Sequence, residues 1–202
     1  APGETLDQII VYLPDRRTLL PADNYYHAFP NLYTIRGTPY RDPRLWVASL
    51  DAMRGLGAEV MIPQHSQPVT GAAEIDRRLM NYRDAIQYVH DETIRLINQG
   101  FGPDEIAAVI TLPPHLAQEP YLQEFYGRVE WAARSGFAGT LGWFSGDPAD
   151  LLPLPASRQA TLMAELAGSA GALADAAEAA LAAGEPSWAL QLAGHLRELD
   201  DA

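Results

Sequence analysis

The sequence contains no cysteine and no lysine among its 202 residues. Without cysteine, the chain can form neither a disulfide nor a thiolate metal site, and it offers no thiol nucleophile. Without lysine, chemistry that runs through a lysine Schiff base is excluded. All 14 basic residues are therefore arginine, and the formal net charge is -12. We do not expect such an acidic chain to bind a nucleic-acid backbone, because that requires clustered cations.

Long apolar runs are absent as well. No stretch reaches the roughly 18 apolar residues that a membrane-spanning helix needs, and the N-terminus does not resemble a signal peptide. The chain opens with Ala1-Pro2-Gly3-Glu4 and has no initiator methionine, which leads us to expect a fragment or a processed product of a longer protein. The N-terminus carries no recognisable targeting signal from which the location could be predicted. The lack of cysteine slightly favours a cytoplasmic location over a periplasmic or secreted one.

The first 71 residues alternate between strand and helix signals. Residues 9–13 are β-branched and aromatic, which predicts a buried strand, and 18–20 predict a second strand in a hairpin with the first. Asp42 and Pro43 are typical of a helix N-terminus, and a further strand at 59–62 leads to the loop that carries His65. Residues 25–42 show no clean period and predict an ordered loop.

After Gly71 the pattern becomes helical throughout. Residues 72–99 predict one long helix whose apolar positions alternate at spacings of four and three, a stripe suited to a partner helix or subunit. The stripe consists of Ile75, Leu79, Tyr82, Ile86, Val89, Thr93 and Leu96. Further helices are predicted at 103–109, 121–137, 155–167, 171–183 and 187–199. We therefore place a domain boundary near residues 71–73, between an α/β part and an all-α part.

Three residues at turns or strand ends are candidate metal ligands: Glu4, Asp23 and His65. Carboxylate and imidazole are ligands that zinc accepts, and a bridging carboxylate suits a pair of metal ions. By spacing alone, Asp23 is more typical of a turn or a helix N-cap than of a metal site, and His65 is more typical of a polar surface loop. The other four histidines form no HxH or HxxxH pair, and we do not expect them to bind metal.

Asn31 and Arg36 are candidate anion-binding residues in the aromatic-rich loop. The guanidinium of Arg36 could hold a sulfate, phosphate or carboxylate group through paired hydrogen bonds. The alternative is that Arg36 stacks on Tyr33 or pairs with Asp42. The residues themselves leave both interpretations open.

Longer motifs resemble a known family. The PGE turn, HAFPNLYTIRG, RDPRLW and IPQHSQPVTG are similar to the later part of a metallo-β-lactamase-fold domain, in the alkyl sulfatase group. The segments YRDAIQYVHDETIRLINQG, ITLPPHL, YLQEFYGRVEW and LGWFSGDPADLLPLP resemble the helical dimerisation domain of that group. The resemblance covers nearly the whole chain in order. It implies the second half of an αββα sandwich over residues 1–72, followed by a dimerisation domain over 73–202.

The resemblance also implies roles for the candidate residues. Glu4 matches the first acid of a binuclear zinc site, Asp23 the bridging acid and His65 the late histidine. Asn31 and Arg36 match positions that grip the sulfate group. The implied reaction is hydrolysis of an alkyl sulfate ester by a metal-activated water.

Departures from the family pattern limit this expectation. The HxHxDH segment, which supplies more than half of the ligands, is missing, and Asp23 stands where the family often has glutamate. Trp131 replaces a histidine proposed to protonate the leaving group, and Phe137 replaces a tyrosine. We therefore assign no catalytic residue in this chain and expect no activity from it alone, unless a separate N-terminal fragment completes the site. The alternatives are a hydrolase for another ester class and a non-catalytic module that forms a homodimer through the stripe of helix 72–99.

Overall fold

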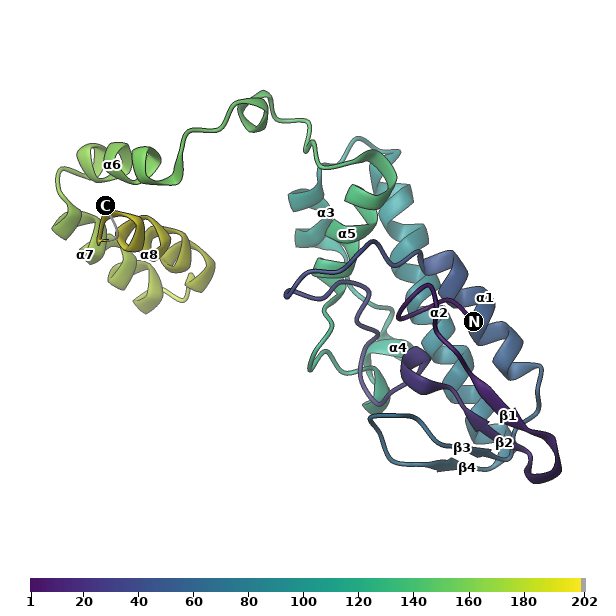
Figure 1. Ribbon diagram of the computed structural model, residues 1–202. Coiled ribbons are helices and arrows are strands. Elements are labelled where there is room, and N and C mark those ends of the chain that lie inside the picture. Colours follow the sequence, from purple (N-terminus) through teal and green to yellow (C-terminus); the bar gives the residue numbers. More distant parts are fainter. Residues whose placement is uncertain (201–202) are drawn as a thin grey trace. The chain divides into compact units, whose positions relative to one another are not determined.

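The computed structural model describes residues 1–200 (Figure 1). The chain divides into two compact units, residues 1–146 and 147–202. We refer to them as the N-terminal unit and the C-terminal unit. The first holds a small sheet with helices, and the second holds helices only.

The sheet of the N-terminal unit has four short strands in the order β1-β2-β3-β4. They are β1 (Val11–Leu13), β2 (Thr18–Leu20), β3 (Val60–Met61) and β4 (Val69–Thr70). The predicted hairpin is confirmed, since β1 and β2 pair antiparallel, whereas β2 and β3 pair parallel. The strand β2 has its predicted range, whereas β1 and β3 are shorter than predicted, and residues 9, 10, 59 and 62 lie outside them.

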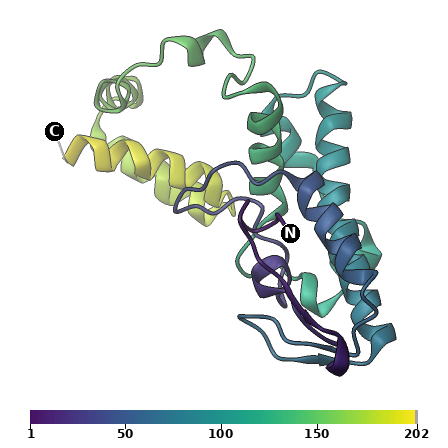
Figure 2. The same ribbon diagram turned by 45° about the vertical axis from the view of Figure 1, so that its right-hand side comes forward.

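Two helices cover one face of this sheet (Figures 1 and 2), α1 (Pro43–Arg54) and α2 (Ala72–Ile97). Leu19, Met61 and Val69 share that face and are at most 4% exposed, because they pack into the same core as the helices. The opposite face carries Val11 and Leu13, which are 45% and 40% exposed. The sheet is thus covered on one side and leaves apolar side chains open on the other.

The apolar stripe of α2 is buried inside the chain. All seven of its predicted residues are at most 4% exposed, because α2 packs against α1, α3 (Pro103–Val109) and α5 (Val129–Leu141). The period of the stripe was predicted correctly. The prediction that it binds a second copy of the chain is wrong, since the chain's own helices cover it.

The predicted helix at 121–137 is wrong in its first half. Between α4 (Pro114–Ala117) and α5, the chain forms a short 3-10 helix, η3 (Pro120–Leu122), and then an irregular segment. This segment lies against a distant loop, because the backbone N–H of Phe29 donates to the carbonyl of Gln123 at 2.9 Å. A helix there would remove this contact.

The C-terminal unit contains η4 (Pro148–Leu151), α6 (Ala156–Ala167), α7 (Ala170–Ala182) and α8 (Pro186–Asp200). The three predicted α-helices are confirmed within one residue at each end. The helices pack on one another in all three pairings. Its buried side chains are small or aliphatic, namely Ala160, Leu173, Ala180, Ala189 and Leu192.

The expected fold class, an α/β part followed by helices, is confirmed. The secondary structure changes at residue 72, but the compact units divide after residue 146 because α2 packs on α1. The assignment of residues 1–72 and 73–202 to two family domains stays a prediction. Within residues 1–200, no helix is both long and apolar enough to cross a bilayer.

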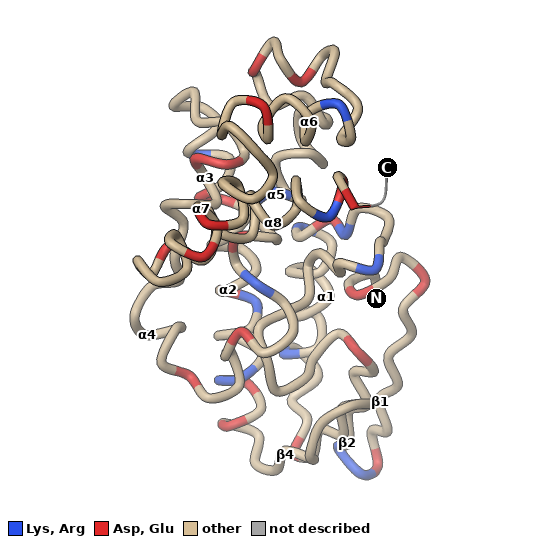
Figure 3. The backbone as a smooth tube through the Cα atoms, turned by 90° about the vertical axis from the view of Figure 1, so that its left-hand side faces the viewer, with Lys and Arg blue, Asp and Glu red and all other residues tan. Residues whose placement is uncertain are grey.

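Both signs of charge are interspersed along the backbone, as Figure 3 shows for α2. Neighbouring turns of α2 form ion pairs, including Arg78–Glu74 at 2.5 Å and Arg95–Glu92 at 2.6 Å. Such pairs at three- or four-residue spacing stabilise a helix surface modestly.

Candidate functional site

Two candidate residues meet because their strands are parallel neighbours. The carboxyl ends of parallel strands lie at the same sheet edge. Asp23 follows β2 in the 3-10 helix η2 (Ala22–Asn24), and His65 lies in the loop after β3. Asp23 Oδ1 lies 2.6 Å from His65 Nδ1. This contact holds the ring so that Nε2 is its remaining ligand atom.

Glu4 reaches the same region through the buried residue Asn24. The side-chain oxygen of Asn24 accepts a hydrogen bond from the backbone N–H of Glu4 at 3.0 Å. The backbone carbonyl of Asn24 accepts one from the indole N–H of Trp46 at 3.1 Å. The hydroxyl of Ser49 also donates to the Pro2 carbonyl at 2.6 Å. The first turn of the chain is thereby anchored to η2 and α1.

Arg41 connects Glu4 with the anion-binding candidate Asn31. Its guanidinium is buried, pairs with the carboxylate of Glu4 and donates to the backbone carbonyl of Asn31. The side-chain oxygen of Asn31 is buried and has no hydrogen-bond partner among residues 1–200. An unsatisfied buried oxygen of this kind is unusual and calls for a partner.

Arg36 stands on a tight turn, in which the N–H of Gly37 donates to the carbonyl of Thr34 at 2.9 Å. Its guanidinium donates to the hydroxyl of Tyr126 at 2.6 Å. The alternative pairing with Asp42 is not seen, because that carboxylate caps α1 and pairs with Arg44.

The five predicted site residues line one pocket of about 370 Å³ together with two tyrosines, Tyr26 and Tyr126. We call it the polar pocket. Burial raises the pKa of Tyr26, so its phenol stays protonated at neutral pH and donates to the Phe29 carbonyl at 3.0 Å.

Sequence reasoning missed both tyrosines of the polar pocket. Tyr126 arrives there because the next residue, Gly127, lets the irregular segment press against residues 29–31. A Cβ at Gly127 would lie 2.7 Å from the carbonyl oxygen of Pro30, which is too close for any other residue. The signal for this contact was the glycine itself, but only the fold identifies the backbone that it touches.

The carboxylate and imidazole donors of the polar pocket suit zinc chemically. Their present contacts are with protein groups, since Asp23 contacts His65 and Glu4 contacts Arg41. Within residues 1–200, no three His, Asp or Glu side chains form a group that could hold a metal ion.

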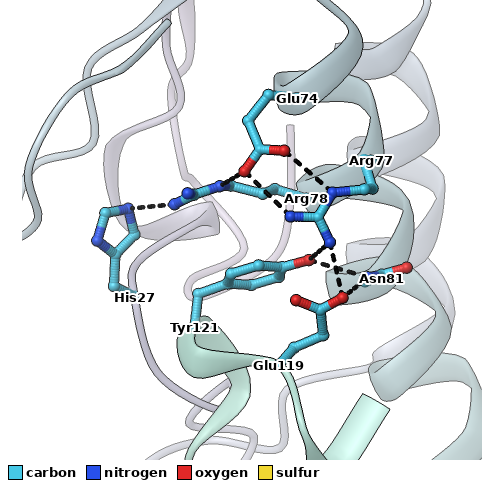
Figure 4. A network of polar contacts seen from close by, with 7 residues as sticks. All are labelled: His27, Glu74, Arg77, Arg78, Asn81, Glu119 and Tyr121. Carbon is cyan, nitrogen blue, oxygen red and sulfur yellow. Dashed lines mark hydrogen bonds and ion pairs between the residues drawn. The ribbon is translucent and has the colours of Figure 1, made fainter. Parts of the chain in front are cut away.

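A polar network braces the loop beside the site (Figure 4). Arg77 and Arg78 of α2 both donate to Glu74, and Arg77 also donates to Glu119 at 2.7 Å. The two guanidinium groups lie over the ring of Tyr121, 5.5 and 4.9 Å from its centre. Burial raises the pKa of Tyr121 to about 12. The network joins α2 to η3.

His27 extends this network towards the polar pocket. Its Nε2 lies 3.3 Å from Arg78 Nη1, and its backbone N–H donates to the hydroxyl of Ser66 at 2.8 Å. Burial, with a smaller contribution from the Arg78 charge, lowers the pKa of His27. His27 therefore serves as a link between α2 and the loop that carries His65.

Two of the departures from the family pattern, Trp131 and Phe137, do not line the polar pocket. Phe137 is 5% exposed and belongs to the core, while Trp131 lines a second pocket of about 490 Å³.

Comparisons with known proteins identify the family to which this chain belongs. The chain is 44% identical over 201 residues to a linear primary-alkylsulfatase from Pseudomonas sp., covering 98% of this chain and 38% of that protein. It is 34% identical over 200 residues to an alkyl/aryl-sulfatase from Saccharomyces cerevisiae, covering 97% and 31%. A solved stereoselective inverting sec-alkylsulfatase from Pseudomonas sp. matches with a TM-score of 0.92 and 33% identity, over 96% of this chain and 31% of that chain.

These matches define an alkylsulfatase-type protein. Residues 102–202, half of the chain, also match the family model described as alkyl sulfatase dimerisation. The chain belongs to the alkyl sulfatase family, and the resemblance seen in its motifs is confirmed. It spans 38% or less of the length of the relatives named above.

Proposed function

We propose that this chain forms the sulfate-binding side and part of the metal-binding side of an active site for sulfate ester hydrolysis. The observation that supports this is the polar pocket, in which all five predicted residues lie together although they are spread from residue 4 to residue 65. The named activities of the relatives agree with this chemistry.

Arg36 and Asn31 would bind the sulfate group. An arginine guanidinium can donate two parallel hydrogen bonds to the oxygens of an oxyanion. The hydroxyl of Tyr126 accepts a hydrogen bond from the Arg36 guanidinium and so helps to position it. The side-chain N–H of Asn31, which lines the same pocket, would donate a neutral hydrogen bond. Arg41 keeps the Glu4 carboxylate paired, which limits its repulsion of an incoming anion.

Asp23, His65 and Glu4 would hold zinc, as a binuclear site in the family. Bound zinc would supply an activated water for attack on the ester. Catalytic zinc sites use about three protein ligands for each ion. Three residues cannot complete two sites, so we propose that a segment carrying HxHxDH must join the chain and that the chain alone does not hydrolyse esters. The open apolar face of β1 offers a surface for such a segment.

Sulfate binding by the purified chain tests the anion-binding half of the proposal. Titration with sodium sulfate, followed by ¹H–¹⁵N NMR, should shift the side-chain amide signal of Asn31. Arg36→Gln should weaken sulfate binding about tenfold, the scale of one lost charge-assisted contact. Arg16→Gln is the matched control, since Arg16 is exposed and lies outside the pocket. Equal affinity in the Arg36 variant and the wild type would refute the assignment.

Hydrolysis assays test the metal-binding half. The chain alone should not release sulfate from decyl sulfate at any zinc concentration. Zinc-dependent turnover that is lost in Asp23→Ala would show that the chain needs no further segment. Isothermal titration with zinc should detect weak binding that Asp23→Ala and His65→Ala each abolish, and unchanged binding in both variants would exclude these ligands. A related hydrolase of another ester class would bind sulfate but leave decyl sulfate intact when the missing segment is supplied.

A second candidate function is homodimerisation through the C-terminal unit. The match to a dimerisation family agrees with this, and the unit leaves large aliphatic side chains exposed. Leu152, Leu166 and Leu190 are 91%, 83% and 74% exposed. Because the stripe of α2 is covered, we assign the contact between copies to these leucines. This role is independent of Asp23 and His65.

A further inference from the structure

The second pocket is built on one face of α5. Five of its residues follow the spacing i, i+3, i+4, i+7 and i+8, which places them on one side of a helix: Trp131, Arg134, Ser135, Ala138 and Gly139. Trp131 and Arg134 carry the large side chains of this face, whereas Ser135, Ala138 and Gly139 carry a hydroxymethyl group, a methyl group and a hydrogen. Large residues at one end and small residues beyond them leave a hollow on the helix surface.

The opposite wall comes from the loop between η2 and α1. Tyr33, Ile35 and Tyr40 line it together with Thr38. The ring of Tyr40 lies directly on Gly139, where a Cβ would stand 2.3 Å from a ring carbon. We call this space, walled by three aromatic rings, the aromatic pocket.

The aromatic pocket carries no uncompensated cation among its described lining residues. The guanidinium of Arg134 is paired with the carboxylate of Asp104, and the remaining lining residues are neutral. Its volume of about 490 Å³ falls in the range of small-molecule sites. The aromatic pocket would therefore bind a small, uncharged, apolar group.

The two pockets share the tight turn at residues 34–37. Ile35 lines the aromatic pocket and Arg36, the next residue, lines the polar pocket. Ile35 is 73% exposed, so the tip of the turn is open to a ligand. One molecule can thus place an anionic group on Arg36 and an apolar group on the other side of the turn.

We propose that the aromatic pocket binds the alcohol part of the ester and selects ring-bearing alcohols over linear chains, with Trp131 as the specificity-determining residue. Its role in an ester rests on the proposed function, whereas binding of the alcohol itself does not. Rigid aromatic walls gain most from a flat ring, because ring pairs add geometry-specific attraction to the burial of apolar surface. A flexible chain gains only the burial and loses rotational freedom on binding.

The test uses neutral alcohols, which do not depend on Arg36 or on metal. The chain is titrated with 2-naphthol and with 1-octanol, and the indole N–H signals are followed by NMR. 2-Naphthol should bind about tenfold more tightly than 1-octanol and shift the Trp131 signal. Equal binding, or tighter binding of 1-octanol, would overturn the proposal.

Variants locate the alcohol. Trp131→Ala should weaken 2-naphthol about tenfold and 1-octanol by less than about threefold. Trp143→Ala, at an indole 70% exposed and outside the pocket, should change neither. If Trp131→Ala does not fold, Ala138→Leu fills the hollow from the helix surface and should abolish 2-naphthol binding. Unchanged 2-naphthol affinity in the variants that fold would refute this site.

A second ligand separates this inference from the proposed function. Arg36→Gln should leave 2-naphthol binding unchanged and weaken 2-naphthyl sulfate about tenfold. If 2-naphthol binds as expected but Arg36→Gln does not change the affinity for 2-naphthyl sulfate, the inference about the aromatic pocket is supported and the assignment of Arg36 to sulfate binding fails. If Arg36→Gln weakens the neutral alcohol equally, the two pockets are not separate sites and the inference fails.

Discussion

The N-terminal unit and the C-terminal unit bury different kinds of side chain. The first fully buries Trp46, Tyr25 and Tyr82, whose rings contact one another around α1 and α2. The second buries three alanines and two leucines, while leucines such as Leu152 and Leu166 stay exposed. Because burial of apolar surface drives folding, the N-terminal unit is stabilised mainly by its own core. The second has a small core and would gain stability from a partner.

The largest expected effect comes from the aromatic core. Trp46→Ala should lower the free energy of unfolding of the N-terminal unit by about 3–5 kcal/mol, because it leaves a cavity and removes the hydrogen bond to Asn24. Guanidinium titration followed by circular dichroism measures it. Trp143→Ala, an exposed tryptophan, should change it by less than about 0.5 kcal/mol. Both tryptophans lie in the N-terminal unit, so an equal loss in both variants would show that burial of aromatic rings does not set the stability of this unit.

The buried ion pair beneath the polar pocket comes next. The side chains of Arg41 and Glu4 are 6% and 21% exposed, so Arg41→Gln should destabilise the chain by about 2 kcal/mol by leaving a carboxylate unpaired. Arg17→Gln breaks the Arg17–Glu59 pair, in which both side chains are about half exposed, and should cost less than about 1 kcal/mol. Urea titration of both variants provides the measurement, and equal costs would contradict the distinction.

The proposed role of the exposed leucines of the C-terminal unit in dimerisation can be tested by replacing one of them with a charged residue. Leu166→Glu should weaken a dimer about tenfold or more, since a carboxylate would be buried at the contact. Light scattering over a dilution series measures this. Leu45→Glu, at a position 42% exposed on α1, is the matched control and should leave the dimer intact. A wild-type chain that is monomeric throughout the series would refute the dimer.

The smallest expected effect is a dependence on pH. The folded pKa of His27 lies below its usual value of 6.5, so the unfolded chain binds more protons between the two values. Its stabilising contribution is therefore complete above the usual pKa and is lost as pH falls towards the folded one. His27→Gln should reduce the difference in Tm between about pH 7.5 and about pH 5.5 by roughly 1 °C. An unchanged difference would show that His27 does not titrate within the fold.

Local signals were sufficient for much of the fold. The start of α1 was predicted from Asp42 and Pro43, and the structure shows the Asp42 carboxylate accepting the N–H of Arg44 at 2.9 Å. The three α-helices of the C-terminal unit were predicted within one residue at each end. The first half of the helix predicted at 121–137 failed because a contact with Phe29 competes with helical hydrogen bonding.

The candidate site shows the same division. Its carboxylates and histidine were chosen by residue type and by motif, and the parallel pairing of β2 with β3 brings Asp23 to His65. Tyr126 could not be chosen, because its contact with Arg36 spans 90 positions in the sequence. The partner of the α2 stripe was also missed, since an apolar period predicts that a face is buried without identifying what buries it.

The sequence by itself determined the family, the order of strands and helices, and the residue types available for anion and metal binding, because these depend on local pattern and side-chain chemistry. Only the tertiary structure decided that five of those residues share one pocket, that α2 is covered by its own chain, and that Trp131 lines a separate aromatic pocket. Those outcomes depend on contacts between distant segments, where glycines such as Gly127 and Gly139 permit approaches that no local pattern encodes.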